Sequence, residues 1–147
     1  MRHARANGSR MLRRTLVAAL AVASAAALTG CGRDGDRAKV RTVTERFFAA
    51  VQRGDGASAC SQLSPDTRSE LESQESKPCA RAIAGMGLHG AAITRVQVFI
   101  TNAKADLAGG ESAFLDQGPQ GWQLSAAGCK PQGGKPADEP YDCEVQD

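Results

Sequence analysis

Apolar and polar residues follow a helical period over the part of the chain that begins near residue 38. From Ala38 to Arg53, apolar and small side chains recur about every 3.6 residues, which places them on one side of an amphipathic helix. The residues on that side are Val40, Val43, Thr44, Phe47, Phe48, Ala50 and Val51. We interpret this side as the face that packs in a protein core, and Gly54 as the residue that ends the helix.

Three shorter helices are predicted before a glycine-rich segment at residues 85–90. Asp55 is a favourable cap for a helix that ends near residue 63. Ser64 and Pro65 provide a capping serine and a proline at the first position of another helix, which ends near residue 74. A last helical segment is expected over residues 79–84.

After residue 90 the period shortens to about two residues, which is typical of strands with one buried face. The alternation predicts strands over residues 94–100, 103–107, 112–117 and 122–126, joined by glycine-containing turns. A loop is expected from Lys130 to Pro140, and a short strand over residues 141–145. The pattern thus predicts an α+β domain, with N-terminal helices on an antiparallel sheet of about four strands plus a short C-terminal strand.

The residues before this domain have the pattern of an export signal. A basic segment over residues 1–14 precedes an alanine-rich apolar run over residues 15–28, which is shorter than the ~20 residues of a permanent membrane helix. Translation can begin at Met1 or at Met11, because both precede a basic segment and the apolar run. The run closes on four residues that resemble the lipobox of bacterial lipoproteins. They are Leu28, Thr29, Gly30 and Cys31.

The lipobox resemblance implies cleavage before Cys31 and a diacylglyceryl lipid on its thiol. Residues 1–30 are then a lipoprotein signal peptide, residues 31–37 a flexible tether, and residues 38–147 a single domain. The expected location is the extracytoplasmic face of the cell membrane, where the lipid on Cys31 is the anchor.

The charge balance changes when the signal peptide is removed. Five of the 18 basic residues and none of the 16 acidic residues precede Cys31. The remaining 13 bases and 16 acids give the mature chain a net charge of −3. A chain with this charge lacks the basic surface that nucleic-acid binding requires, so no nucleic-acid partner is expected.

Four cysteines follow Cys31, and an even number in a small exported domain predicts two disulfides. Of the three possible pairings, the local one is the most economical, because it fastens the helices to one another and the C-terminal segment to the sheet. This pairing is Cys60 with Cys79 and Cys129 with Cys143. A zinc site is not expected, because the chain has no Cys-x-x-Cys motif.

The mature chain carries no catalytic or cofactor-binding motif that we can identify. His89 is its one histidine and lies in a glycine-rich link, where we expect a surface position. No serine lies in a Gly-x-Ser-x-Gly motif, and no glycine-rich segment has the pattern of a phosphate-binding loop. Glu70, Glu72 and Glu75 are expected to form a solvated helix face, and Trp122 to pack in the core. We therefore predict no catalytic residue, metal site or cofactor.

Short motifs along the whole chain resemble those of a group of small actinobacterial lipoproteins. Besides the lipobox, they are Phe47-Phe48-Ala49-Ala50, Gly54-Asp55, Ala59-Cys60, Leu63-Ser64-Pro65, Pro78-Cys79, Gly121-Trp122, Ala127-Gly128-Cys129 and Tyr141-Asp142-Cys143-Glu144. These proteins are similar to the nuclear-transport-factor-2-like superfamily. This resemblance implies a curved sheet wrapped around helices, often with a pocket in its concavity, and it favours structural disulfides.

The resemblance implies a fold rather than a reaction. Isomerases of this superfamily use a tyrosine and acids inside the cone, whereas the sole tyrosine here, Tyr141, is in the C-terminal segment, and Asp106 and Asp116 lie on predicted strands. We therefore expect a non-enzymatic accessory domain that binds a small apolar ligand or an envelope protein. Two alternatives are a module that docks on an envelope membrane protein through a sheet face, and an isomerase-like enzyme with its substrate in the cone.

Overall fold

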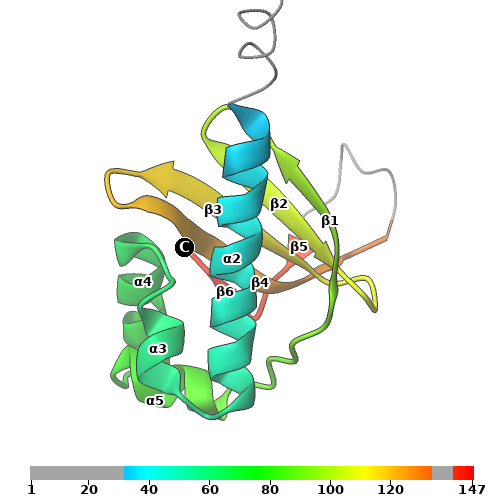
Figure 1. The fold of residues 1–147 in the computed structure, drawn as a ribbon. Coiled ribbons are helices and arrows are strands. Elements are labelled where there is room, and N and C mark those ends of the chain that lie inside the picture. The colour runs from blue at the N-terminus through cyan, green and yellow to red at the C-terminus, as the bar shows by residue number, and fades with distance from the viewer. Residues whose placement is uncertain (1–31, 134–140) are drawn as a thin grey trace, which may run out of the picture. The chain divides into compact units, whose positions relative to one another are not determined.

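The computed structural model describes residues 32–133 and 141–147. The predicted signal peptide, the lipobox with Cys31, and residues 134–140 of the predicted loop lie outside the described residues. Within them, four helices are followed by strands that form an antiparallel sheet, as the sequence predicts (Figure 1).

Three helices end within one residue of the predicted position, whereas the helix expected to end near residue 63 ends at Cys60. The helices are α2 (Arg33–Gln52), α3 (Gly56–Cys60), α4 (Pro65–Glu75) and α5 (Cys79–Gly85). Both predicted caps are present: the Asp55 carboxylate accepts from the Ser58 N–H at 3.0 Å, and the Ser64 hydroxyl accepts from the Thr67 N–H at 3.1 Å. Gly54 follows α2 with a φ of 69°, a left-handed conformation that glycine adopts without strain.

The sequence predicts a flexible tether over residues 31–37. This prediction is wrong from Arg33 onward, because α2 begins at Arg33 rather than at Ala38. Two acids in the first turn of α2 stabilise this start: Asp34 pairs with the Arg37 side chain at 2.8 Å, and Asp36 with the Lys39 side chain at 3.1 Å. The indole N–H of Trp122, in the sheet, also donates to the Asp36 carboxylate at 3.3 Å. This last contact is tertiary, so the local pattern does not reveal it.

The strands follow the predicted order. They are β1 (Ile93–Val98), β2 (Asn102–Leu107), β3 (Ser112–Gly118), β4 (Gly121–Pro131), β5 (Tyr141–Asp142) and β6 (Val145–Gln146). Strands β1 to β4 form a meander, and β5 and β6 both pair with β4. The first strand ends at Val98, so the prediction that it extends to Ile100 is wrong: Phe99 and Ile100 lie in the turn to β2.

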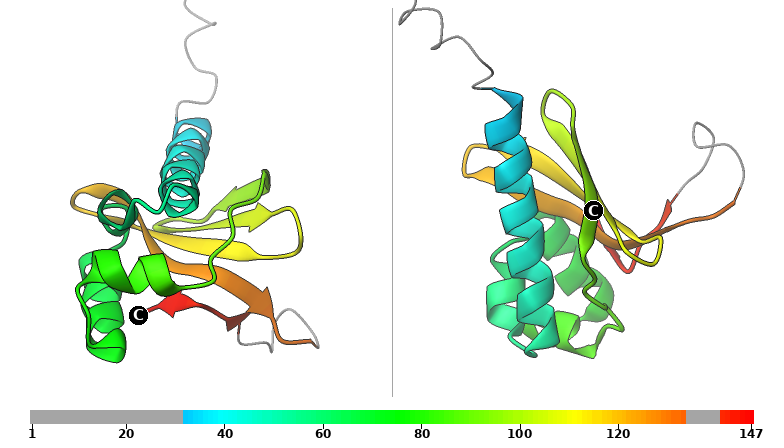
Figure 2. Two further views of the ribbon diagram at one scale, coloured as in Figure 1. Left: turned by 90° about the horizontal axis from the view of Figure 1, so that it is seen from below. Right: turned by 45° about the vertical axis from the view of Figure 1, so that its right-hand side comes forward.

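Helix α2 lies across one face of the sheet, and α3, α4 and α5 gather beside its C-terminal half (Figures 1 and 2). We call the sheet face toward α2 the inner face. Phe47 on α2, Leu115 on β3 and Leu124 on β4 are fully buried between them. The Phe47 and Phe48 rings pack edge to face with centroids 5.0 Å apart, and Trp122 is buried as predicted.

The connection between α3 and α4 is bonded directly to β4. The Ser64 N–H donates to the Leu124 carbonyl at 2.8 Å, and the Leu124 N–H donates to the Gln62 carbonyl at 2.9 Å. Leu63 and Leu124 thus form a parallel bridge, and both are fully buried. This bridge fixes the start of α4 against the β3–β4 hairpin.

Candidate functional site

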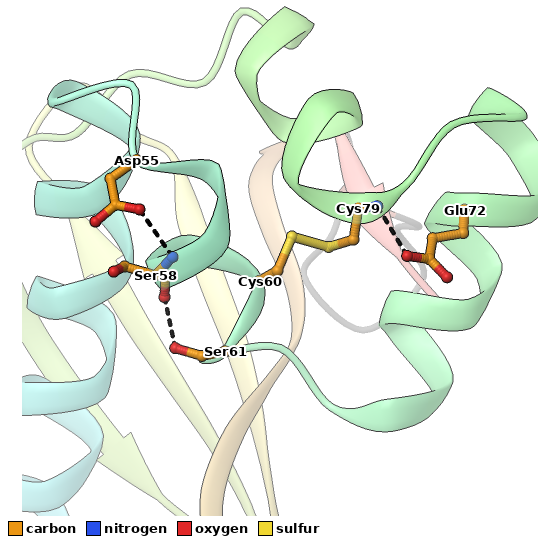
Figure 3. The surroundings of a disulfide bond; sticks show 6 residues. All are labelled: Asp55, Ser58, Cys60, Ser61, Glu72 and Cys79. Atoms are coloured by element: carbon orange, nitrogen blue, oxygen red, sulfur yellow. Dashed lines mark hydrogen bonds between the residues drawn. A yellow bond between two sulfur atoms is a disulfide. The ribbon is translucent and has the colours of Figure 1, made fainter.

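The predicted disulfide between Cys60 and Cys79 is present (Figure 3). It joins the last residue of α3 to the first residue of α5, with Cα atoms 6.1 Å apart. Both cysteines are buried, and α3 is capped at its start by Asp55. The bridge therefore fixes the short helices to one another, which is the structural role predicted for it.

Glu72 is exposed, as predicted for the glutamate face, and its side chain also makes a structural contact. Its carboxylate accepts a hydrogen bond of 2.8 Å from the backbone N–H of Cys79, at the start of α5 (Figure 3). The residue before α5 is Pro78, which offers no side-chain cap, so a side chain from α4 satisfies this donor instead. Glu70 is exposed, as predicted, and contacts Gln74, whereas Glu75 is half-buried and pairs with Lys77.

The second predicted disulfide, Cys129 with Cys143, fastens the C-terminal segment to β4. It brings the ring of Tyr141 against the ring of Phe114 on β3, edge to face with centroids 4.9 Å apart. As predicted, Tyr141 packs the C-terminal segment on the sheet. The contact is on the outer face, the sheet face opposite α2, because Phe114 alternates with the buried, inward-facing Ala113 and Leu115.

Lys104 is the centre of a polar group on the outer face. Its ammonium donates to the Tyr141 hydroxyl at 2.7 Å and pairs with the Asp106 carboxylate at 3.0 Å. Asp106 also accepts from the Ser112 hydroxyl at 3.0 Å. Burial disfavours the charged form of Lys104, but the hydrogen bonds to Tyr141 and Asp106 outweigh it, so the pKa of Lys104 is raised. A lysine that stays protonated cannot accept a proton. Its contacts with Tyr141 and Asp106 instead hold the C-terminal segment on the sheet.

The residues that an isomerase of the resembled superfamily would use do not face the interior. Asp106 and Asp116 both lie on the outer face, opposite Ser112 and Asn102 in the β2–β3 register. The space between α2 and the inner face is packed with buried side chains. The candidate pocket of this domain lies elsewhere, at the end of the β3–β4 hairpin.

A half-open pocket of about 360 Å³ lies between the start of α4 and the β3–β4 hairpin. Three of its lining residues are acidic, three are glutamines and none is basic. The lining residues are Ser64, Pro65, Asp66, Asp116, Gln117, Gly118, Pro119, Gln120, Gln123 and Asp147. The Leu63–Leu124 bridge forms this pocket by holding α4 beside the hairpin.

Two of the three carboxylates of this acidic pocket have neutral hydrogen-bond partners. Asp116 accepts a hydrogen bond from the Asn102 amide, and Asp147 accepts one of 3.4 Å from the Thr67 hydroxyl. Within the described part of the chain, Asp66, Asp116 and Asp147 form no ion pair with lysine or arginine. Carboxylates and carboxamides without a paired cation suit an ammonium or guanidinium group with several hydrogen-bond donors.

The acidic pocket is not evident from the sequence pattern. Asp66, Asp116 and Asp147 are separated by 50 and 31 residues, so no local pattern brings them together. A metal ion is not indicated, because residues 32–133 and 141–147 contain no group of three or more His, Cys, Asp or Glu side chains arranged to hold one. His89 is exposed, as predicted, and is not among the lining residues.

The turn between β1 and β2 is a second feature that the sequence pattern did not reveal. Its Phe99 is 60% exposed and its Ile100 is 93% exposed, and they are the exposed large apolar residues of the described chain. The alternation of polar and apolar residues continues through this turn, and neither Gly nor Pro marks it. The signal that could have located it is the polar pair Thr101-Asn102 that follows.

Two further observations complete the description of the chain. Among the helices of the described residues, none combines the length and the apolar character needed to cross a bilayer. No protein-family model, curated protein or solved structure matches the chain.

Proposed function

We propose that this chain is an extracytoplasmic lipoprotein with a non-enzymatic binding domain, anchored to the membrane by a lipid on Cys31. The observation that carries the proposal is the pairing of the four later cysteines with one another. Disulfides persist in exported proteins, and this pairing leaves Cys31 outside both bridges and available for modification. The lipobox before Cys31 and the domain that begins at Arg33 support the same conclusion.

The lipid anchor is tested by the intact mass of the protein extracted from its own membrane. We expect the mass of residues 31–147 with two disulfides, increased by a diacylglyceryl group. A Cys31→Ser variant should lose its membrane association, whereas Thr29→Ser, which keeps a small residue before the cysteine, should remain membrane-bound. An unmodified N-terminus, or a Cys31→Ser protein that stays wholly in the membrane fraction, contradicts the proposal.

The binding part of the proposal rests on the acidic pocket. A pocket of about 360 Å³ is within the ~300–1,000 Å³ of small-ligand sites, and its lining includes acidic and carboxamide side chains. The unpaired carboxylates favour a cationic group, such as an amine or the arginine side chain of an envelope protein. This replaces the expected apolar ligand, because the apolar side chains of the domain are packed in its core.

Arginine amide is a suitable probe for this pocket. In two-dimensional NMR spectra of the detergent-solubilised protein, it should shift the side-chain amides of Gln117 and Gln123, and added salt should weaken the effect. The triple variant Asp66→Asn, Asp116→Asn, Asp147→Asn should abolish the shifts. Glu70→Gln, which removes an exposed acid outside the pocket, is the control and should leave them unchanged. Equal shifts in the triple variant contradict binding at this site.

The isomerase-like alternative receives no support from a specific contact. Tyr141 and Asp106 are bonded to a protonated Lys104 on the outer face, and the interior is filled by side chains such as Phe47 and Leu115. The same polar residues weaken the alternative of docking through a sheet face. On the outer face, the side chains of Lys104, Asp106 and Tyr141 already form hydrogen bonds and an ion pair with one another.

A further inference from the structure

The β1–β2 turn exposes apolar side chains on a backbone that is firmly held. The Phe99 N–H donates to the Asn102 carbonyl at 2.8 Å, which closes a tight turn around Ile100 and Thr101. The Gln117 N–H donates to the Thr101 carbonyl at 2.8 Å and ties the turn to β3. We call residues 99–101 the hairpin tip. Its apolar side chains are therefore presented to solvent by an ordered backbone rather than by a loose loop.

The composition of the hairpin tip conflicts with local preference. Tight turns favour Gly, Asn, Asp, Ser and Pro, because these residues suit the turn backbone and remain solvated. Phe99 and Ile100 instead expose 60% and 93% of their surface. Adjacent exposed apolar side chains on an ordered turn are a candidate interaction surface.

The hairpin tip lies at the N-terminal end of α2. The Gln52 side chain, at the C-terminal end of α2, bonds to the Gly90 carbonyl at 3.2 Å, and Arg41, nearer its start, bonds to the Ile93 carbonyl at 3.3 Å. From Gly90 onward the chain thus runs back along α2 toward its start. Figure 1 and the right-hand view of Figure 2 both show the β1–β2 turn beside the first turn of α2.

The start of α2 is separated from Cys31 by one residue, Gly32. Because an extended residue spans at most ~3.6 Å, the Cα atoms of Cys31 and Arg33 are at most about 7 Å apart. A lipid on Cys31 therefore places the membrane surface at the end of the domain where Phe99 and Ile100 are exposed. Covalent connectivity therefore limits how far the lipidation position can lie from the end of the domain that carries the hairpin tip.

We infer that the hairpin tip inserts Phe99 and Ile100 into the bilayer interface beside the lipid on Cys31. This inference rests on the proposed lipid anchor. Residues 96–103 carry no charged side chain, so insertion of the hairpin tip buries no charge. Aromatic and aliphatic side chains on a rigid support are suited to the boundary between headgroups and acyl chains. The domain then contacts the membrane at two points, which fixes its orientation.

The test places a tryptophan at the hairpin tip and measures its quenching by lipid. The full lipoprotein, purified with its lipid, is reconstituted into vesicles of equal parts phosphatidylcholine and phosphatidylglycerol that carry a nitroxide on the acyl chains. The variant is Ile100→Trp. The matched control is Arg53→Trp, an exposed position one residue beyond the other end of α2, which is about 30 Å long. The buried Trp122 gives the same background in both variants and in the parent protein.

We expect the emission of Ile100→Trp to fall about twofold or more, because interfacial apolar groups lie about 5–10 Å deep in the boundary region. Reference vesicles carry the nitroxide on the headgroup of a minor lipid instead of on the acyl chains. The emission of Arg53→Trp and of the parent should fall no more in the acyl-chain-labelled vesicles than in these reference vesicles. Equal quenching of Ile100→Trp and Arg53→Trp overturns the inference. A blue-shifted but unquenched tryptophan at position 100 also overturns it and assigns the hairpin tip to a protein contact.

The intact mass of the same sample separates the two proposals. A protein that carries no lipid overturns the proposed anchor and, with it, the insertion of the hairpin tip. A lipidated protein whose Ile100→Trp emission is unquenched overturns the insertion alone and leaves the lipid anchor in place.

Discussion

Replacement of Phe47 by alanine tests whether the packing of α2 on the sheet stabilises the domain. Phe47 is fully buried, and its ring also packs edge to face on Phe48 at a centroid distance of 5.0 Å. Truncation of a buried phenylalanine removes apolar contacts and leaves a cavity, at a cost of about 3–5 kcal/mol. Because small domains are stable by about 5–15 kcal/mol, Phe47→Ala should remove a large part of the free energy of unfolding.

The assay is urea unfolding monitored by the fluorescence of Trp122. This residue is the one tryptophan of the chain and is 5% exposed, so its emission reports loss of the core. With a urea dependence of about 1–2 kcal/mol per M, the unfolding midpoint of Phe47→Ala should fall by about 1.5–5 M. Both disulfides must remain closed during the measurement, because their reduction would add a second loss of stability.

Phe99→Ala is the matched control, since the same atoms are removed from a side chain that is 60% exposed. Exposed substitutions usually change stability by less than about 0.5 kcal/mol, so the midpoint of Phe99→Ala should stay close to that of the parent. A Phe47→Ala midpoint no lower than that of Phe99→Ala would refute the packing argument.

Three further changes test the disulfide, the salt bridge at the start of α2 and a helix cap. The double variant Cys60→Ala, Cys79→Ala should lose about 3 kcal/mol of stability for its 19-residue separation, measured by urea unfolding; no loss would contradict a structural role for this bridge. Hydrogen bonds from Lys39 and, second, from Trp122 lower the pKa of Asp36 below its usual 3.8. The Asp36 carboxylate therefore stabilises the fold above the unfolded pKa, and this contribution is lost as the pH falls through the lower folded pKa. Asp36→Asn should therefore show a smaller loss of urea midpoint between pH ~6 and pH ~3 than the parent, and an unchanged acid loss would contradict this. Ser64→Ala should cost about 1 kcal/mol in urea unfolding, and an equal loss in Ser73→Ala, an exposed position inside α4, would show that capping is not the cause.

Features set by local sequence were predictable for this chain. The amphipathic face with Phe47, the cap at Ser64 and the turns at glycine each depend on a few consecutive residues, and all are present. The pairing of Cys60 with Cys79 was also predictable, because local bridges close the two halves of the chain separately. Periodicity and capping thus sufficed for the α+β fold class.

Features that depend on distant contacts were not predictable. Helix α2 extends to Arg33 partly because Asp36 meets Trp122, 86 residues away. The acidic pocket depends on the bridge of Leu63 to Leu124, which no period in either segment indicates. The early end of β1 was missed because the apolar alternation continues into the turn, where only the backbone bonds around Thr101 reverse the chain. Patterns along a single sequence do not show which distant residues meet in the fold.

The early start of α2 limits where an anchored domain can act. A domain joined to its lipid by a long flexible segment samples a deep layer above the bilayer, and its local concentration near a partner depends on that length. With α2 beginning at Arg33, no such segment separates the domain from Cys31. With the lipid proposed on Cys31, the domain would meet a partner by lateral diffusion in the membrane plane, and that partner would itself have to come close to the bilayer.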